Sequence, residues 1–290
     1  ALMPVPALSF ATRYYQANAG VMVTASHNPA KYNGYKAYGP DGCQMTDDAA
    51  AVVYAEIQNT DILTGAKLMS FEEGIAQGLI EYVGDDCKEA LYDAIKARSI
   101  RPGLCKTAGL KLVYSPLNGS GLVPVMRILK DIGIDDITIV PEQQYPDGNF
   151  PTCPYPNPEI RQAFECALKL AETVNPDVLL ATDPDSDRIG IAVPDNDGNF
   201  VLLNGNQTCV LLTYYMCRRW KENGMLDGKQ YIVKTIVTSE MMADVAKSFG
   251  LEYFDCLTGF KNIAKVIRQE EAKGKTYIGG GEESFGFLAG

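Results

Sequence analysis

Residues 178–193 read VLLATDPDSDRIGIAV, and this stretch gives the clearest indication of the fold. Two apolar runs, at residues 178–182 and 189–193, flank the acidic segment DPDSDR. Short apolar runs bounded by turn-forming residues are typical of buried strands. We therefore predict two strands joined by a loop that carries Asp183, Asp185 and Asp187 at alternate positions.

Similar apolar runs recur along the chain and alternate with longer amphipathic segments. Further strands are predicted at residues 20–24, 110–114, 136–140, 231–237 and 276–279. Helices are predicted at residues 46–57, 157–172, 207–221, 239–249 and 262–273. Asn157 followed by Pro158 is a typical helix start, and Gly250 is a typical helix stop. This alternation predicts the α/β class with mixed, mostly parallel sheets.

Two turn-rich segments, near residues 83–87 and 195–204, suggest domain boundaries. We predict three consecutive α/β domains at residues 1–85, 86–203 and 204–290. Each domain contains a strand that ends in a loop with chemically interesting side chains. No short-period repeat or low-complexity segment interrupts this organisation.

The composition argues against nucleic-acid-binding, membrane-spanning and zinc-binding proteins. The net charge of −10 argues against general nucleic-acid binding, which needs a basic surface. No apolar run reaches the ~18–20 residues of a membrane span, so we expect no membrane segment, and no signal peptide is visible. The eight cysteines form no CxxC pair and there is one histidine, so no zinc site is indicated. The cysteines are interpreted as buried thiols, which favours a cytoplasmic location.

The segment TASHNP, residues 24–29, follows the first predicted strand and contains the only histidine. Loops after strands of parallel sheets expose side chains to a crevice, and the loop amides can hold phosphate oxygens. Ser26 is therefore a candidate nucleophile, and His27 is a candidate hydrogen-bonding partner for phosphate or a substrate hydroxyl. The alternative is an ordinary turn around Asn28 and Pro29.

The acidic loop is a candidate metal site. Carboxylates at i, i+2 and i+4 can converge on one hard cation, and an oxygen-only ligand set suits Mg²⁺. An EF-hand is excluded because Arg188 stands where glycine is needed and Pro194 where glutamate is needed. Arg188 can direct its guanidinium group at a phosphate or sugar oxygen. The alternative is a solvated acidic turn.

A third loop, GGGEESFG at residues 279–286, follows the last predicted strand. Its glycines allow the backbone to approach a ligand closely. Glu282 and Ser284 can present an acceptor and a hydroxyl group to a sugar, with Glu283 facing away. A flexible glycine turn is the alternative.

These three motifs, in this order, resemble the active-serine, metal and sugar loops of the α-D-phosphohexomutases, the phosphoglucomutase/phosphomannomutase family. The resemblance covers essentially the whole chain. It implies that Ser26 is phosphorylated and that Mg²⁺ binds the three aspartates and an oxygen of the Ser26 phosphate. It also implies that Glu282 and Ser284 bind the hexose hydroxyls.

The resemblance suggests two further site residues. Lys36, in YNGYK, falls near the transferred phosphate as a general acid/base or a charge stabiliser, and Lys261, in TGFK, falls near the phosphate or sugar. For both, a solvated surface lysine is the alternative. Asn118 departs from the family, which often has a histidine in that loop, so we interpret the loop as structural.

The implied activity is transfer of a phosphoryl group between C1 and C6 of glucose phosphate, with glucose 1,6-bisphosphate as intermediate and sugar phosphates as ligands. A phosphomannomutase, a phosphopentomutase or a bisphosphate synthase is the nearest alternative. From other classes, a non-catalytic Mg²⁺ and sugar-phosphate binding module and a metal-dependent phosphatase stay open. The resemblance further implies a fragment without the start of the first domain and without the fourth domain, inactive in isolation. Sugar preference and oligomeric state are left open.

Overall fold

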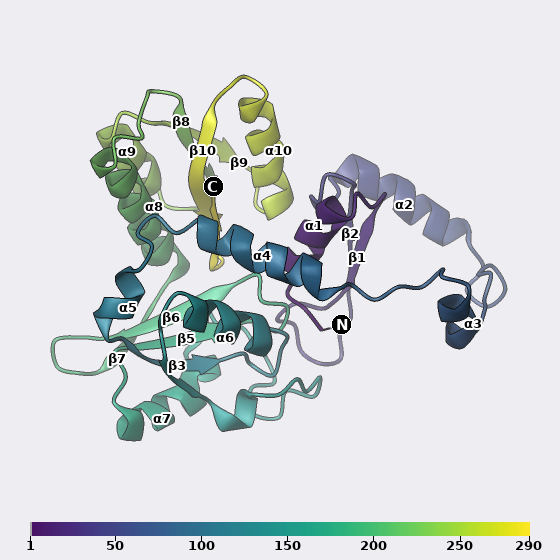
Figure 1. Ribbon diagram of the computed structural model, residues 1–290, viewed down its shortest axis with the longest axis horizontal. Helices are drawn as coiled ribbons and strands as arrows, with labels where there is room; N and C mark the ends of the chain where they lie inside the picture. Colours follow the sequence, from purple (N-terminus) through teal and green to yellow (C-terminus); the bar gives the residue numbers. More distant parts are fainter. Residues whose placement is uncertain (1) are drawn as a thin grey trace.

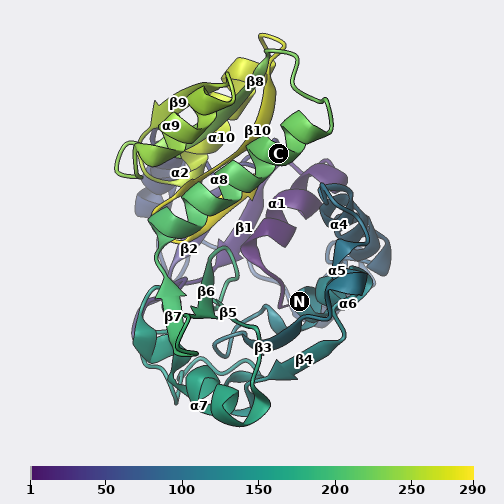
Figure 2. The same cartoon turned by 90° about the vertical axis from the view of Figure 1, so that its left-hand side faces the viewer.

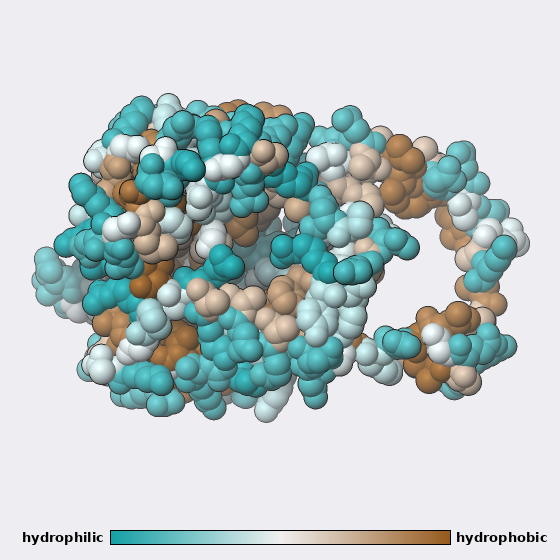
Figure 3. All heavy atoms as spheres, turned by 45° about the horizontal axis from the view of Figure 1, so that its top comes forward, coloured by the Kyte–Doolittle hydropathy of each residue, from teal (hydrophilic) through white to brown (hydrophobic). Residues whose placement is uncertain are grey.

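The computed structural model describes residues 2–290, which form three sheets with helices packed around them (Figure 1). The first part contains a small antiparallel pair of strands, with α1 packed against β1. Its elements are α1 (Val5–Tyr14), β1 (Gly20–Val23), β2 (Tyr35–Tyr38), α2 (Asp47–Asn59) and α3 (Phe71–Ala76). Hydrophobic side chains gather on the surface over α2 and α3, at the right of Figure 3.

The second part is a five-stranded sheet in the order β4-β3-β5-β6-β7. A long helix, α4, runs back to it from the first part (Figure 1). Its core lies under α7 and includes Val113, Phe164 and Leu179, which are almost fully buried. The elements are α4 (Asp85–Ala97), α5 (Leu104–Ala108), β3 (Lys111–Ser115), α6 (Leu122–Asp131), β4 (Asp136–Ile139), α7 (Glu165–Val174), β5 (Val178–Thr182), β6 (Ile189–Pro194) and β7 (Phe200–Leu203).

The third part is a four-stranded sheet in the order β11-β10-β8-β9, covered on both faces. One apolar cluster lies under α8 and α9, and another lies under α10, on the other side of the sheet in Figure 1, while Figure 2 shows α8 across the front of this part. The elements are α8 (Gly205–Glu222), β8 (Gln230–Thr235), α9 (Met241–Ser248), β9 (Glu252–Cys256), α10 (Phe260–Glu271), β10 (Thr276–Glu282) and β11 (Gly286–Ala289).

All strands predicted from the sequence are present, with ends shifted by at most three residues, and the α/β class is confirmed. The sequence prediction missed strands β2, β7, β9 and β11 and helices α1, α3, α4, α5 and α6. The helix predicted to start at Asn157 is wrong at its beginning. The Asn157 side chain accepts a hydrogen bond from the Glu159 N–H and closes a turn, so the helix α7 begins only at Glu165.

The sheets are mixed, as predicted, but antiparallel pairings are as numerous as parallel ones among residues 2–290. Strands β3–β4, β3–β5, β8–β9 and β8–β10 pair in parallel, and β1–β2, β5–β6, β6–β7 and β10–β11 pair antiparallel. A parallel return needs a connection of about a dozen residues or more. The loops after β5 and β10 are far shorter, so both return as hairpins that carry site residues at their tips.

Within the described part of the chain, no helix combines the length and the apolarity that crossing a bilayer requires. All eight cysteines are free thiols.

Candidate active site

Ser26 lies in the loop after β1, with its backbone in the left-handed region at φ 52°. Its N–H donates to the Thr24 hydroxyl at 2.9 Å, and that hydroxyl in turn donates to Asp185 at 3.1 Å. Left-handed conformations are uncommon for residues other than glycine and occur often at functional sites. The turn directs the Ser26 hydroxyl toward the loop between β5 and β6.

The Ser26 hydroxyl meets the acidic loop across 157 residues of sequence. Its oxygen lies 3.0 Å from Asp183 Oδ2 and 3.2 Å from Asp185 Oδ1, so its hydrogen has two possible acceptors. The candidate nucleophile therefore lies within hydrogen-bond distance of two of the three candidate metal ligands.

The three aspartates form a tight cluster. One ligand oxygen from each of Asp183, Asp185 and Asp187 can be chosen so that all lie within 4.8 Å of one another. Asp183 Oδ1 accepts the backbone N–H groups of Asp187 and Arg188, both at 3.1 Å, which fixes the loop and leaves Oδ2 facing Ser26. Burial, together with the neighbouring carboxylates, raises the pKa of Asp183. Such a group of carboxylates needs a cation close by.

Lys36, on β2, supplies one cation. Its Nζ lies 2.8 Å from Asp185 Oδ2 and 3.0 Å from Asp187 Oδ2. Burial alone would lower the pKa of Lys36, but the charges of Asp187 and Asp185 raise it overall. The lysine is thus a positive charge in the site rather than a solvated surface residue.

His27 is next to the serine. Its Nδ1 lies 3.3 Å from Ser26 Oγ, and its ring packs edge-on against Tyr155 with centroids 5.6 Å apart. Burial and the charge of Arg188 lower the pKa of His27 to about 4. The imidazole is therefore neutral near pH 7 and can donate or accept a hydrogen bond.

Arg188 follows the acidic loop and interacts electrostatically with groups of both the serine loop and the sugar loop. Its Nη1 donates to Glu159 Oε1 at 2.8 Å. Its positive charge contributes to the low pKa of His27, and it opposes the rise that burial causes in the pKa of Glu282. Sequence reasoning missed Glu159 and Tyr155, because their segment, residues 153–160, carried no recognisable catalytic spacing.

The loop at residues 115–121 packs against the acidic loop at Pro184 and is hydrogen-bonded to it. Both the N–H and the hydroxyl of Ser120 donate to Pro184 O, at 2.8 and 2.9 Å. A Cβ at Gly119 would lie 2.3 Å from Pro184 Cα, so only glycine permits this approach. The Asn118 amide donates to the carbonyl groups of Glu142 and Tyr145 at 3.3 and 2.9 Å, in keeping with a structural loop.

Glu282 and Ser284 lie together at the tip of the β10–β11 hairpin. Glu282 accepts a hydrogen bond from the Gly259 N–H and, at 3.3 Å, from the Ser284 hydroxyl. The Ile189 N–H donates to Phe285 O at 3.2 Å, which joins this hairpin to the strand after the acidic loop. The second and third parts of the chain thus bring their loops side by side.

Lys261 lies two residues after Gly259, which contacts Glu282, but its side chain contacts the first part of the chain. In the structure it forms an ion pair with Asp47 at the start of α2, and Arg268 forms a second pair with Asp41. Both ion pairs join α10 to the first part of the chain.

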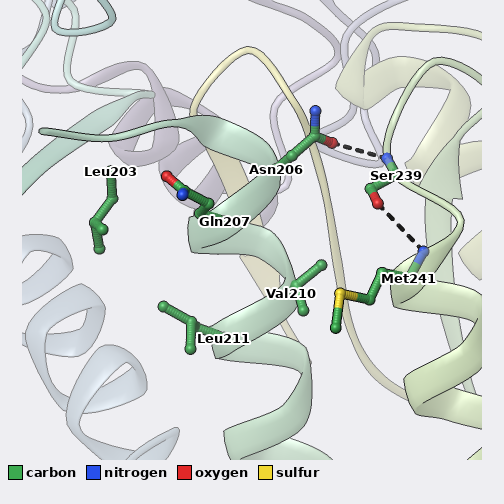
Figure 4. A pocket seen from close by; sticks show the side chains of 7 residues that line it. All are labelled: Leu203, Asn206, Gln207, Val210, Leu211, Ser239 and Met241. Atoms are coloured by element: carbon green, nitrogen blue, oxygen red, sulfur yellow. Dashed lines mark hydrogen bonds between the residues drawn. The ribbon is translucent and has the colours of Figure 1, made fainter.

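A hollow of about 330 Å³ lies near the start of α8 and α9, outside the Ser26 and aspartate cluster (Figure 4). Its seven lining residues are Leu203, Asn206, Gln207, Val210, Leu211, Ser239 and Met241. None of these side chains is titratable. We assign no chemistry to it.

Comparison with known proteins gives one consistent result. The models of the alpha/beta/alpha domains I, II and III of phosphoglucomutase/phosphomannomutase match residues 1–63, 89–198 and 204–290. A phosphoglucomutase of Staphylococcus epidermidis is 37% identical over 286 residues, which are 98% of this chain and 50% of that protein. The chain therefore spans about half the length of the curated relatives it matches.

Solved structures share the fold. A phosphoglucomutase/phosphomannomutase family protein from Burkholderia thailandensis is 22% identical with a TM-score of 0.68, over 99% of this chain and 56% of that one. An N-acetylphosphoglucosamine mutase from Aspergillus fumigatus, solved with glucose 1,6-bisphosphate, is 18% identical with a TM-score of 0.60, over 99% and 64%. Because the three domain models of one family match most of the chain, in order, this chain belongs to the phosphoglucomutase/phosphomannomutase family.

Proposed function

We propose that the protein is a phosphohexomutase that interconverts glucose 1-phosphate and glucose 6-phosphate through a phosphoserine at Ser26. The observation that carries the proposal is the position of the Ser26 hydroxyl, 3.0 and 3.2 Å from two aspartates of a buried cluster. Glucose is favoured over mannose or a pentose because phosphoglucomutases of Staphylococcus epidermidis and Staphylococcus aureus are 37% and 35% identical to this chain. The domain division at residues 85/86 and 203/204 is part of the same proposal.

The donor set fits Mg²⁺. All candidate ligands are oxygen atoms, the three carboxylates converge within 4.8 Å, and the Ser26 hydroxyl adjoins two of them. Oxygen ligands shared with a phosphate group are what this ion prefers. When bound, the ion would neutralise charge on the transferring phosphoryl group.

In the forward direction, the bond between phosphorus and Ser26 Oγ breaks as a new bond forms to the free hydroxyl oxygen of the sugar monophosphate, and the proton of that hydroxyl passes to Ser26 Oγ. The product is glucose 1,6-bisphosphate, a compound with which the Aspergillus mutase was solved. The bisphosphate then turns round in the site and returns its other phosphoryl group to Ser26.

The residues around Ser26 divide the remaining tasks. Lys36 and Arg188 offset negative charge, and neutral His27 hydrogen-bonds to phosphate or to the attacking hydroxyl. Glu282 and Ser284 hold the sugar hydroxyls, and Lys261 reaches the substrate if its pair with Asp47 opens. Preorganised charge of this kind is the main source of catalysis in phosphoryl transfer.

We also propose a cytoplasmic location and small sugar phosphates as the ligands. The free state of all eight cysteines supports a reducing compartment. The net charge of −10 supports the absence of a nucleic-acid partner.

The test is site-resolved mass spectrometry of phosphate on Ser26 after incubation with glucose 1,6-bisphosphate and Mg²⁺, with and without a later addition of glucose 1-phosphate. Phosphate gained at Ser26 and lost to the sugar is the expected result. Ser26→Ala should abolish the signal, and Ser248→Ala, at an exposed position on α9, should not.

Other outcomes discriminate the alternatives. Release of inorganic phosphate without a sugar bisphosphate would indicate a metal-dependent phosphatase. A chain that stays unphosphorylated, in this 290-residue form and in any longer natural form, would favour a non-catalytic binding module.

A further inference from the structure

Glu283 stands between Glu282 and Ser284 but faces away from them. Glu282 ends β10, and Glu283 and Ser284 belong to the turn that follows, so the direction of the Glu283 side chain is shown by its contacts. The Glu283 carboxylate accepts hydrogen bonds from the hydroxyl groups of Thr238 at 2.9 Å and Thr235 at 3.2 Å.

These contacts form a closed network. The Glu283 N–H donates back to Thr238 Oγ1 at 3.1 Å, and the two threonine hydroxyl oxygens lie 2.7 Å apart. Both threonines are buried, with 0% and 2% of their surface exposed. Backbone and side chain of Glu283 are thus both tied to the turn after β8.

That turn is itself held firmly. The Ser239 N–H donates to Asn206 Oδ1 on α8 at 2.8 Å, and Figure 4 shows this bond beside the hollow. Lys234, whose side chain is fully buried, donates to Thr238 O at 3.2 Å. The same ammonium pairs with Glu240 at 2.7 Å and with Asp255 at 2.9 Å. The anchor of Glu283 therefore belongs to β8 and α8 rather than to a mobile loop.

Helix α8 confines Glu283 from another direction. A Cβ placed on Gly205 would lie 1.7 Å from Glu283 O, which is an impossible contact. The start of α8 therefore packs directly on the backbone between the two sugar-loop residues.

We propose that Glu283 is a positioning residue for sugar recognition. Its hydrogen bonds to the threonines fix the backbone of the turn. The Glu282 carboxylate and the Ser284 hydroxyl are thereby held in the orientation needed to bind two neighbouring sugar hydroxyls. This inference rests on the proposed function, because it assigns Glu282 and Ser284 to the sugar. Glu283 itself does not contact the substrate.

The experiment compares the binding of glucose 1-phosphate and of inorganic phosphate, by calorimetry, in wild type, Glu283→Ala, Glu283→Gln and Thr238→Val. Outer residues that orient metal-binding side chains typically contribute roughly 10- to 100-fold in affinity or activity, and Glu283 would act on the sugar-binding side chains in the same way. We expect Glu283→Ala to weaken glucose 1-phosphate binding by a factor in this range and to leave phosphate binding unchanged. Glu283→Gln keeps the acceptor oxygen and should restore most of the sugar preference.

Controls separate this inference from a general loss of structure and from the proposed function. Glu271→Ala, at an exposed position on α10, should change neither affinity. If Glu283→Ala does not fold, Thr238→Val, which removes one hydroxyl at nearly constant shape, must show the same selective loss.

Two outcomes would overturn one idea each. A wild-type protein that binds glucose 1-phosphate no better than phosphate would refute the proposed function. The positioning role of Glu283 would be refuted by a different result. In that result the wild type prefers glucose 1-phosphate to phosphate, but the Glu283 and Thr238 variants either keep this preference or lose affinity for both ligands equally.

Discussion

Replacing Lys36 by methionine tests the electrostatics of the site most directly. The variant keeps a side chain of similar length and removes an ammonium group that lies 2.8 and 3.0 Å from two carboxylates. At an effective dielectric constant of about 20, each contact corresponds to roughly 6 kcal/mol of gross attraction. The cost of removing the ammonium from water offsets several kcal/mol of this.

The net loss of folding free energy depends on the aspartate charges that remain in the variant without a partner. Removing one partner of a buried ion pair typically costs about 3–5 kcal/mol, because the remaining charge is uncompensated. The Lys36 side chain is 21% exposed, so we expect about 3 kcal/mol, at the low end of that range. Because the folded-state pKa of Lys36 is raised above 10.5, the stabilisation is complete below that pH and is lost only as the pH rises through the folded-state value.

The assay is urea unfolding at pH 8 without divalent cations, followed by the same titration in Mg²⁺. Lys88→Met is the matched control, since Lys88 forms a 2.8 Å pair with the exposed Asp85, and solvent screening should leave that pair a much smaller contribution. The variant frees Asp185 Oδ2 and Asp187 Oδ2, so Mg²⁺ should bind it more tightly than wild type. At about 100 times its Kd the ion should restore roughly 2.7 kcal/mol.

Two results would refute this reasoning. A loss for Lys36→Met no greater than that for Lys88→Met would show that the aspartates do not depend on this cation. No stabilisation of Lys36→Met by Mg²⁺ would show that the three carboxylates are not a divalent-cation site.

Two further predictions concern residues that support the site. Gly119→Ala places a methyl group 2.3 Å from Pro184 Cα and should cost about 1–3 kcal/mol in urea unfolding, whereas Gly148→Ala, with open space around its Cβ, should stay within about 0.5 kcal/mol. Glu159→Gln weakens a charge-assisted contact to Arg188; we expect slower loss of phosphate from Ser26 to glucose 1-phosphate with the fold intact, and an unchanged rate would remove Glu159 from the site.

The α/β class and the short motifs follow from the sequence, because both depend on local patterns. Apolar runs of strand length report burial wherever they occur, so strands β3, β4, β5, β6 and β8 were predicted near their true positions. The aspartates at alternate positions between two such runs indicated a cation site, because carboxylates so close in sequence can converge on one ion. Each of these inferences uses residues within about ten positions of one another.

Local sequence patterns do not decide which of these loops meet: for Ser26 and the aspartates the family resemblance implied a shared site, and the tertiary structure shows the contact. Ser26 and Asp183 are 157 residues apart, and nothing local to either states that they lie within hydrogen-bond distance. The contacts of Glu159 with Arg188 and of Thr238 with Glu283 depend on the same packing, and so does the choice of a hairpin after β5. Sequence periodicity reports which face of an element is buried, but long-range pairing is fixed by how whole elements pack, and that information is spread over the entire chain.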